Sequence, residues 1–318
     1  MLLVSCAPTA SAHPVTADPS PTSTRPDSRV YVTNQQDNTV SVIDAHAHKV
    51  IATVPAGTAP EGVAVSADGR RLYVADSGSA RVSVLDTHTY KTVATVPVGK
   101  SPTGVALSPD SGSLYVTNGT SNTVSLIDTR TQRATATIPV GRSPVNVALS
   151  RDGAQAYVTN AGSGTLSVID TRTHQVTRQL PAGQSPVAVA VTKDGKAAYV
   201  ADEVGTRVLA IATDSGKAAT VNVGTGPFDV AIGPDGRHAY SANLGPGSVS
   251  VIDTGSKHVS ATIDLGPPGT DPFNLAVTDD AIYVTNQGAG TLAVVDSASR
   301  KVVATVTVGA QPYGVAVS

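Results

Sequence analysis

Short apolar runs separated by turn residues dominate the chain from about residue 29 onward. Within each run, β-branched, small and aromatic residues alternate with polar ones at a period of two, which is typical of a half-buried strand. No window shows the i, i+3, i+4, i+7 spacing of an amphipathic helix. In one stretch the runs are Gly104–Ser108, Leu114–Thr117, Thr123–Ile127 and Ala134–Ile138. The pattern predicts an all-β protein made of short strands.

The runs belong to a repeated unit. The tetrapeptide Tyr31-Val32-Thr33-Asn34 recurs with small changes every 41 to 43 residues, and each copy lies in the second of four apolar runs. Four strands per unit at this period are typical of the blades of a β-propeller. The seven copies begin at Tyr31, Tyr73, Tyr115, Tyr157, Tyr199, Tyr240 and Tyr283. We therefore predict a seven-bladed β-propeller with four-stranded antiparallel blades.

The two ends of the repeat region predict how the ring closes. The first unit begins near Val30 and lacks a first strand, whereas Pro312–Ser318 is a first strand with no blade after it. Closing a ring removes the exposed edges that an open sheet array would leave. We expect the C-terminal strand to complete the N-terminal blade, which makes residues 29–318 a single domain.

These motifs resemble a known family. The Tyr-Val-Thr-Asn repeat, the Ser101–Ala106 strand and the Val249–Thr254 run are similar to the YVTN-repeat β-propellers, which include bacterial exported YncE-like proteins and archaeal surface-layer proteins. The resemblance covers residues 29–318 and implies the propeller fold. It implies less about function, because propellers of this type serve mostly as binding or surface scaffolds.

Composition narrows the function classes. The 318 residues include 29 glycines, 21 prolines, one cysteine and no tryptophan, and the formal net charge is −2. A single cysteine excludes a disulfide scaffold, and the near-neutral charge argues against a strongly basic nucleic-acid binder. No run of about 18 apolar residues is present, so no membrane-spanning segment is expected.

Residues 1–28 form a separate region. Leu3-Val4-Ser5-Cys6 resembles the bacterial lipobox, in which the cysteine is lipidated, and Ala10-Ser11-Ala12 would suit an ordinary signal peptidase. No basic n-region and no full apolar h-region precede Cys6, so an ordinary N-terminal tail is the alternative. The Pro/Ser/Thr-rich stretch that follows predicts a disordered linker. We expect an extracytoplasmic protein, either a cell-envelope lipoprotein anchored through Cys6 or a secreted one.

Most polar residues with catalytic potential occupy repeated positions. An Asn or Asp ends every second strand, and an Asp such as Asp44 or Asp86 ends most third strands. Repetition in every blade favours a structural role in turns, since a catalytic residue is needed only once. The histidines are scattered among turns (His46, His88, His174, His238 and His258), whereas a metal site needs three or four converging ligands. We expect no metal and no cofactor.

Function is best sought where the copies differ. One position follows the proline that opens each innermost strand, and its occupants are Glu61, Thr103, Val145, Val187, Phe228, Phe273 and Tyr313. Seven of the nine tyrosines belong to the repeat, and three of the four remaining aromatic residues fall at this position in successive blades. Aromatic rings with a few polar groups are the usual ingredients of a ligand site. The predicted ligand-binding residues are Glu61, Asn146, Phe228, Asp229, Phe273, Asn274 and Tyr313. The alternative is that the rings only fill gaps between blades.

The leading functional hypothesis is a non-enzymatic binding scaffold that contacts a protein or cell-envelope ligand through the loops around its channel. We expect the protein to be a monomer. A propeller-type lactonase, other hydrolase or lyase is the first alternative, and only Glu61 and Asp229 offer acid–base groups for it. Single-stranded DNA binding, as implied by the YncE-like resemblance, is the second. The densest basic set, Arg130, Arg133, Arg142, Arg151, Arg172 and Arg178, is spread over turns of two blades, so a nucleic-acid partner is not expected.

Overall fold

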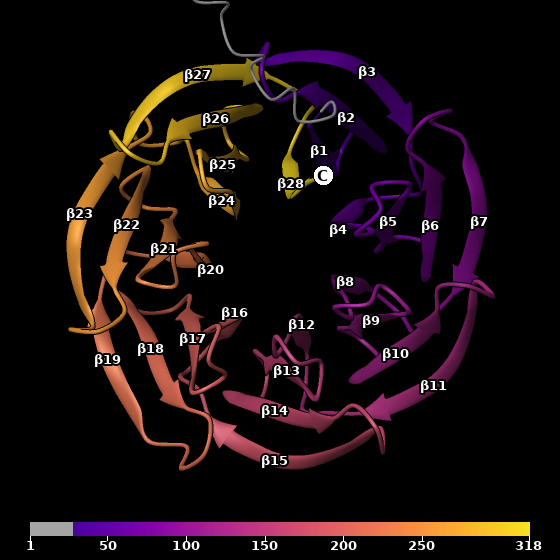
Figure 1. Ribbon diagram of the computed structural model, residues 1–318, viewed down its shortest axis with the longest axis horizontal. Coiled ribbons are helices and arrows are strands. Elements are labelled where there is room, and N and C mark those ends of the chain that lie inside the picture. The colour runs from indigo at the N-terminus through magenta and orange to yellow at the C-terminus, as the bar shows by residue number, and fades with distance from the viewer. Residues whose placement is uncertain (1–27) are drawn as a thin grey trace, which may run out of the picture.

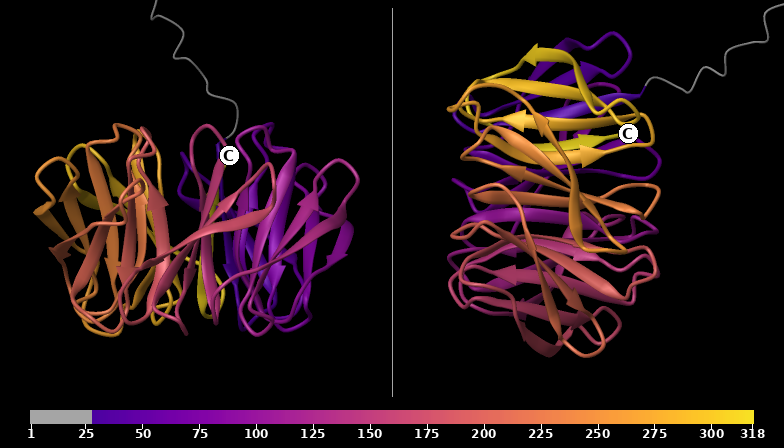
Figure 2. Two further views of the ribbon diagram at one scale, coloured as in Figure 1. Left: turned by 90° about the horizontal axis from the view of Figure 1, so that it is seen from below. Right: turned by 90° about the vertical axis from the view of Figure 1, so that its left-hand side faces the viewer.

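Seven four-stranded antiparallel sheets surround a central axis in the computed structural model, which describes residues 28–318 (Figure 1). The predicted all-β, seven-bladed propeller is confirmed. Figure 2 shows the ring from the side, with the connecting loops gathered on two opposite faces. Cys6 and the predicted export signal lie outside the described residues, so their assignment stays a prediction.

Each blade places one strand at the axis and one at the rim. The innermost strands are β28 (Pro312–Val317), β4 (Pro60–Val65), β8 (Pro102–Leu107), β12 (Pro144–Leu149), β16 (Pro186–Val191), β20 (Pro227–Ile232) and β24 (Pro272–Val277). The second strands are β1 (Arg29–Asn34), β5 (Arg71–Asp76), β9 (Ser113–Asn118), β13 (Gln155–Asn160), β17 (Ala197–Asp202), β21 (His238–Asn243) and β25 (Ala281–Asn286).

The two outer layers follow the same order around the ring. The third strands are β2 (Thr39–Asp44), β6 (Arg81–Asp86), β10 (Thr123–Asp128), β14 (Thr165–Asp170), β18 (Arg207–Ala212), β22 (Ser248–Asp253) and β26 (Thr291–Asp296). The rim strands are β3 (Lys49–Pro55), β7 (Thr92–Pro97), β11 (Arg133–Pro139), β15 (Gln175–Pro181), β19 (Ala218–Asn222), β23 (His258–Asp264) and β27 (Lys301–Thr307). Within residues 28–318 there is no helix with the length and apolarity that a membrane crossing requires.

The ring closes as predicted. Strand β28 pairs antiparallel with β1, with Val317 opposite Val30 and Val315 opposite Val32. The amide of Ser318 donates to the carbonyl oxygen of Arg29 at 3.0 Å. The C-terminal strand is therefore the innermost strand of the N-terminal blade, and both ends of the sheet array are covered.

The apolar core lies between neighbouring blades. The repeat tyrosines are buried there, and Tyr157, for example, packs with Leu180, Val189 and Val200 from its own and the next blade. Burial raises the pKa of the Tyr157 phenol above its ordinary value. Each sheet buries both of its faces against neighbouring sheets. The ring therefore has a separate apolar core between each pair of blades in place of one large central core.

The repeated Asn and Asp side chains are structural. The Asp44 carboxylate accepts hydrogen bonds from the amides of His46 (2.9 Å) and Ala47 (2.7 Å), which closes the turn after β2. At the end of β1, the Asn34 amide donates to Ser41 Oγ at 2.9 Å, and its oxygen accepts from the Gly309 amide at 3.0 Å. The structural interpretation of these two repeated positions is confirmed.

The threonine of the Tyr-Val-Thr-Asn repeat joins adjacent blades, a role that the sequence did not indicate. In β9, the Thr117 hydroxyl accepts from the Gly104 amide (2.8 Å) and donates to the carbonyl oxygen of Val145 in the next blade (2.8 Å). A Cβ at Gly104 would lie 2.6 Å from that same oxygen, so glycine permits the close approach of the two backbones. The equivalent threonines are Thr33, Thr159 and Thr285.

Candidate functional site

Each innermost strand opens with a proline, and a β-bulge follows directly after it. In the second blade Pro60 pairs with Asp76, and the register then shifts before Val63 pairs with Val74. The residue after the proline thereby leaves the regular ladder, as residues at bulges do. The same shift occurs in β8, β12, β16, β20, β24 and β28. This geometry gathers the seven variable side chains at one end of the channel.

Three of these side chains form a continuous aromatic arc. The rings of Phe228 and Phe273 are stacked with centroids 3.7 Å apart, and Tyr313 lies edge-on to Phe273 at 4.7 Å. Phe228 and Tyr313 are also in edge contact at 6.4 Å, and both line a small cavity. Phe273 is only 8% exposed because its neighbours cover it, so its ring acts mainly in packing. The structure therefore agrees in part with both interpretations of the sequence: the Phe273 ring fills space between blades, and the Phe228 and Tyr313 rings face the channel.

Glu61 lies at one end of the aromatic arc, across the ring closure. Its Oε1 accepts a hydrogen bond from Gln35 Nε2 at 3.0 Å. The hydroxyls of Ser77, Thr103 and Tyr313 lie nearby and favour the charged form of the carboxylate. Burial raises the pKa of the Glu61 carboxyl above its ordinary value, against the opposing effect of these groups. Gln35 is neutral, and so are the three nearby hydroxyls, so no cation in the described part of the chain compensates the carboxylate.

Glu203 lies beyond the other end of the arc, in the loop between β17 and β18. Its Oε2 accepts from Ser185 Oγ at 3.3 Å. Burial raises the pKa of the Tyr313 phenol well above its ordinary value, and the carboxylates of Glu61, Asp229 and Glu203 raise it further. Glu61 and Glu203 are the only glutamates in the chain. We call the set Glu61, Glu203, Phe228, Phe273 and Tyr313 the aromatic mouth.

Sequence reasoning missed Glu203, although a signal was present. Its place directly after the second strand is taken by Gln35, Ser77, Gly119, Ala161, Leu244 and Gln287 in the other blades. A glutamate there departs from the repeat as clearly as Glu61 does. The departure is on a different strand connection, however, and only the ring brings the two glutamates to one face.

Asp229 lines the small cavity beside Phe228 and Tyr313, and it also joins two blades. It pairs with Ala242 in β21, which replaces the threonine of the repeat. Its Oδ1 accepts from the Val230 amide (2.8 Å), and its Oδ2 accepts from the Leu275 amide of the next blade (2.9 Å). The side chain is buried, and this burial raises the pKa of its carboxyl to about 7. Asp229 thus joins the two blades where Ala242 has no hydroxyl, by accepting from an amide of the next blade, whereas the repeat threonine donates to a carbonyl oxygen.

Asn146 and Asn274 occupy the equivalent position in their own blades. Their backbone amides donate to Thr159 Oγ1 (3.1 Å) and Thr285 Oγ1 (3.0 Å), respectively. Both residues line the same cavity as Phe228 and Tyr313. The cavity measures about 60 Å³, which is room for about two water molecules. The throat of the channel can therefore admit a small chemical group but not a whole drug-sized molecule.

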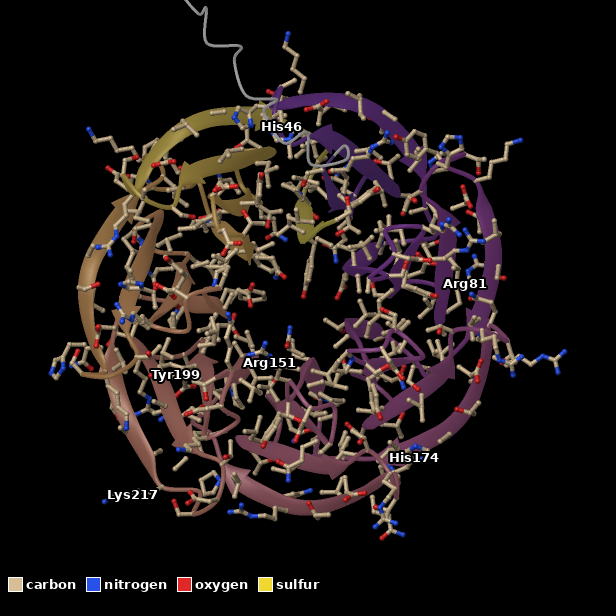
Figure 3. All side chains as sticks on the ribbon, viewed as in Figure 1. His46, Arg81, Arg151, His174, Tyr199 and Lys217 are labelled. Carbon is tan, nitrogen blue, oxygen red and sulfur yellow. The ribbon has the colours of Figure 1, made fainter. Side chains whose placement is uncertain are left out.

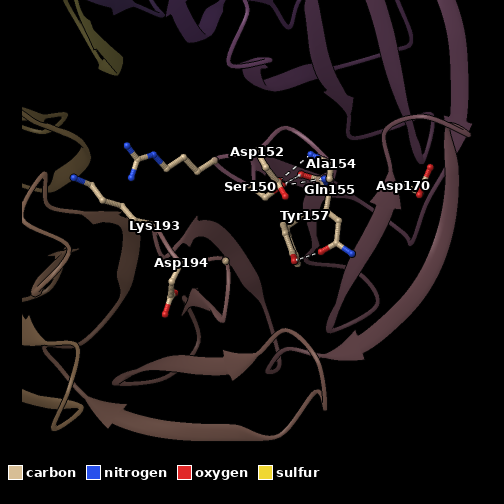
Figure 4. A pocket seen from close by; sticks show the side chains of 10 residues that line it. Ser150, Asp152, Ala154, Gln155, Tyr157, Asp170, Lys193 and Asp194 are labelled. Atoms are coloured by element: carbon tan, nitrogen blue, oxygen red, sulfur yellow. Dashed lines mark hydrogen bonds between the residues drawn. The ribbon is translucent and has the colours of Figure 1, made fainter.

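A larger cavity opens on the opposite face. It measures about 580 Å³ and lies beside the turns that follow β12 and β16 (Figure 4). Asp152 and Asp194 face inward to their own turns, where each accepts from a hydroxyl and a backbone amide. Arg151 points into the central opening (Figure 3), and the Lys193 ammonium donates to the carbonyl oxygen of Pro234. The lining mixes both signs of charge, so this cavity selects no ligand class.

The remaining sequence candidates do not converge. His46 and His174 lie near the rim (Figure 3), and no group of three His, Cys, Asp or Glu residues within the described part of the chain could hold a metal ion. Among the basic residues, Arg142 follows β11 on the face of the aromatic mouth, whereas Arg151 lies at the opposite end of the channel. The Arg178 guanidinium donates to the carbonyl oxygen of Thr213. These side chains do not form a common basic surface.

Comparison with known proteins identifies the family. A model of the virginiamycin B lyase family matches residues 9–295. The chain belongs to this family. The match supports a β-propeller family, while the resemblance to YVTN-repeat, YncE-like proteins stays a prediction. A search of the curated proteins found no match to this sequence.

Solved structures share the fold of this virginiamycin B lyase family member. Hydrazine synthase of Kuenenia stuttgartiensis aligns with a TM-score of 0.73 and 23% identity, over 80% of this chain and 88% of that one. A functionally unknown protein of Desulfotomaculum acetoxidans aligns with a TM-score of 0.75 and 19% identity, over 91% and 98% of the two chains. Dihydro-heme d1 dehydrogenase NirN, in complex with DHE, aligns with a TM-score of 0.67 and 16% identity, over 91% and 74%. At these identities the likeness concerns the fold alone.

Proposed function

We propose that this protein is an exported or lipid-anchored propeller of the cell envelope that binds a ligand at the aromatic mouth. The observation that carries the proposal is the arc of Phe228, Phe273 and Tyr313 in successive blades with a glutamate beyond each end. The other blades have no aromatic residue at this position, and the rings of Phe228 and Tyr313 line the cavity and are not covered by their neighbours as Phe273 is. The lipobox-like Leu3–Cys6 segment supports the cellular location.

Capture of a ligand from envelope fractions tests this function. The full chain and a Phe228→Leu/Tyr313→Leu variant are immobilised and compared, because these two rings face the cavity and their loss leaves the buried Phe273 in place. Tyr90→Leu is the matched control, since Tyr90 is the fourth aromatic residue outside the repeat and packs under the rim with Val54 and Leu72. We expect the control to retain the bound ligand and the mouth variant to lose it. Equal retention by both variants would refute the proposed site.

A lyase activity is the second candidate, favoured by the family and by one contact. The hydroxyl of Tyr313 and the Glu61 carboxyl interact across the ring closure, and burial raises the pKa of each group. In an elimination, Glu61 would remove a proton from carbon and Tyr313 would protonate the leaving oxygen, while a new double bond forms between the two carbons. The raised pKa of Tyr313 makes it a weak acid, which is why we place binding first.

Incubation with virginiamycin B separates the two functions. An elimination adds no water to the products, whereas hydrolysis adds one, so the product mass identifies the reaction. If the protein is a lyase of this kind, Glu61→Gln and Tyr313→Phe abolish turnover and Asp279→Asn, on the opposite face, does not. An unchanged substrate after prolonged incubation would remove this second candidate for virginiamycin B and leave the binding function standing.

A further inference from the structure

Within residues 28–318, the two carboxylates of the aromatic mouth, Glu61 and Glu203, have no cationic partner within ion-pair distance. The group that holds the Glu61 carboxylate is the neutral side-chain amide of Gln35, and the hydroxyls around it are neutral as well. Glu203 is likewise held by the Ser185 hydroxyl. A half-buried carboxylate without a cation is costly, and a cationic ligand would offset that cost.

The aromatic rings favour the same sign of ligand. The face of an aromatic ring is negative, so a cation within about 6 Å of a ring centroid is attracted, by roughly 0.5–2 kcal/mol according to how far it is desolvated. Phe228 and Tyr313 stand at right angles to one another (88°) and both border the cavity. A group seated there meets a ring face, a ring edge and the buried carboxyl of Asp229. Glu61 and Glu203 lie outside this cavity, in the blades on either side of the aromatic arc.

The size of the cavity limits which part of the ligand enters. About 60 Å³ accommodates an ammonium group with one or two attached carbons, and the walls of Val145, Val187 and Ala188 are apolar. Gly62, Gly104 and Gly314 form another part of the wall, where they have no side chain to project into the cavity. A longer ligand must therefore insert its head group and extend outward over the loops.

From the aromatic arc, the unpaired glutamates and the small cavity together, we propose that the aromatic mouth binds the protonated amino group of an organic cation. This inference rests on the proposed binding function and names the chemical class of its ligand. The aromatic rings supply the surface, Glu61 and Glu203 supply the charge, and the throat admits only the ammonium end. Neutral and anionic analogues of the same length lack the charge that the two carboxylates attract.

Three probes of equal length test the ligand class. Butylammonium, 1-butanol and butyrate are titrated into the full-length protein at low salt, and binding is followed by ligand-observed NMR. We expect butylammonium to bind at least about tenfold more tightly than 1-butanol and to weaken as salt is added. Glu61→Gln and Glu203→Gln keep the shape of each side chain, and we expect each to reduce butylammonium binding severalfold. Asp279→Asn removes an exposed carboxylate from the opposite face and should leave binding unchanged.

The possible results separate the assignment of an amine ligand from the proposed binding function on which it rests. Equal binding of butylammonium and 1-butanol, preference for butyrate, or no binding of any probe overturns the assignment of an amine. The same holds if Asp279→Asn weakens binding as much as Glu61→Gln does. The envelope capture with the Phe228→Leu/Tyr313→Leu variant is independent of charge, so the proposed site survives these results if that capture succeeds.

Discussion

Asp229 offers the sharpest test of how the blades are joined. The structure makes it a substitute for the missing threonine at Ala242, through its bond to the Leu275 amide. It is also a buried carboxyl whose pKa is raised from 3.8 to about 7. A raised pKa means that the folded protein holds a proton that the unfolded chain has released, so the contribution to stability is complete below about pH 4 and declines as the pH rises toward 7.

The size of this effect follows from the shift. One pKa unit corresponds to about 1.4 kcal/mol, so a shift of about three units lowers the free energy of unfolding by roughly 4 kcal/mol between pH 4 and pH 7. Asp229→Asn has no titrating group at this position and lacks this decline. The difference in unfolding free energy between the native protein and the variant should therefore change by several kcal/mol across the window, in favour of the variant at the higher pH.

Urea unfolding of both proteins between about pH 4 and pH 8 measures this difference. Other carboxyls titrate in both proteins alike, so they cancel in the comparison. A second variant, Asp229→Gly/Ala242→Thr, recreates the arrangement of Gly104 and Thr117, and we expect it to be stable with no pH dependence from this site. A difference that stays constant with pH would refute the burial argument. A double variant less stable than Asp229→Gly alone would refute the substitution argument.

Four further predictions concern the scaffold. Thr117→Val leaves a buried amide and carbonyl without their shared partner, and urea unfolding should show a loss of about 1–3 kcal/mol. Gly104→Ala places a methyl group 2.6 Å from the Val145 oxygen and should lower the melting temperature clearly, whereas Gly205→Ala, whose nearest neighbour is at 3.4 Å, should not. Hydrogen bonds, chiefly from the Thr89 amide, lower the pKa of Asp86 from 3.8 to about 2, so its stabilisation is lost as the pH falls through that range. Asp86→Asn should flatten this acid loss, and an unchanged acid unfolding curve would contradict it. Deleting residues 312–318 exposes the edge of the first blade, and size-exclusion chromatography should show association instead of the native elution volume.

The repeat made the fold predictable, because periodicity constrains every blade in the same way. The tyrosine spacing predicted seven blades, and the missing first strand near Val30 predicted closure by Pro312–Ser318; both are confirmed. The structural role of the repeated Asn and Asp residues was predictable for the same reason. The gathering of Phe228, Phe273 and Tyr313 followed from their equal places in successive blades.

Other features depended on contacts between blades, which a single repeat does not contain. Asp229 was expected in a pocket with the aromatic rings, and it lines the cavity beside Phe228 and Tyr313. Its second role was not predictable: the carboxylate also bonds to the next blade, beside Ala242, which lacks the hydroxyl of the repeat. Glu203 was missed because it lies on a different strand connection from Glu61.

The sequence by itself determined the blade, the number of blades and the order in which the ring is completed, since these follow from local strand patterns and their period. Only the tertiary structure decided which departures from the repeat act together. Ring closure brings Glu61 beside Tyr313, although 252 positions separate them in the chain, and it sets Glu203 on the same face. The physical reason is that burial and electrostatic interaction depend on distance in space, and the ring places distant residues of different strands at one end of its axis.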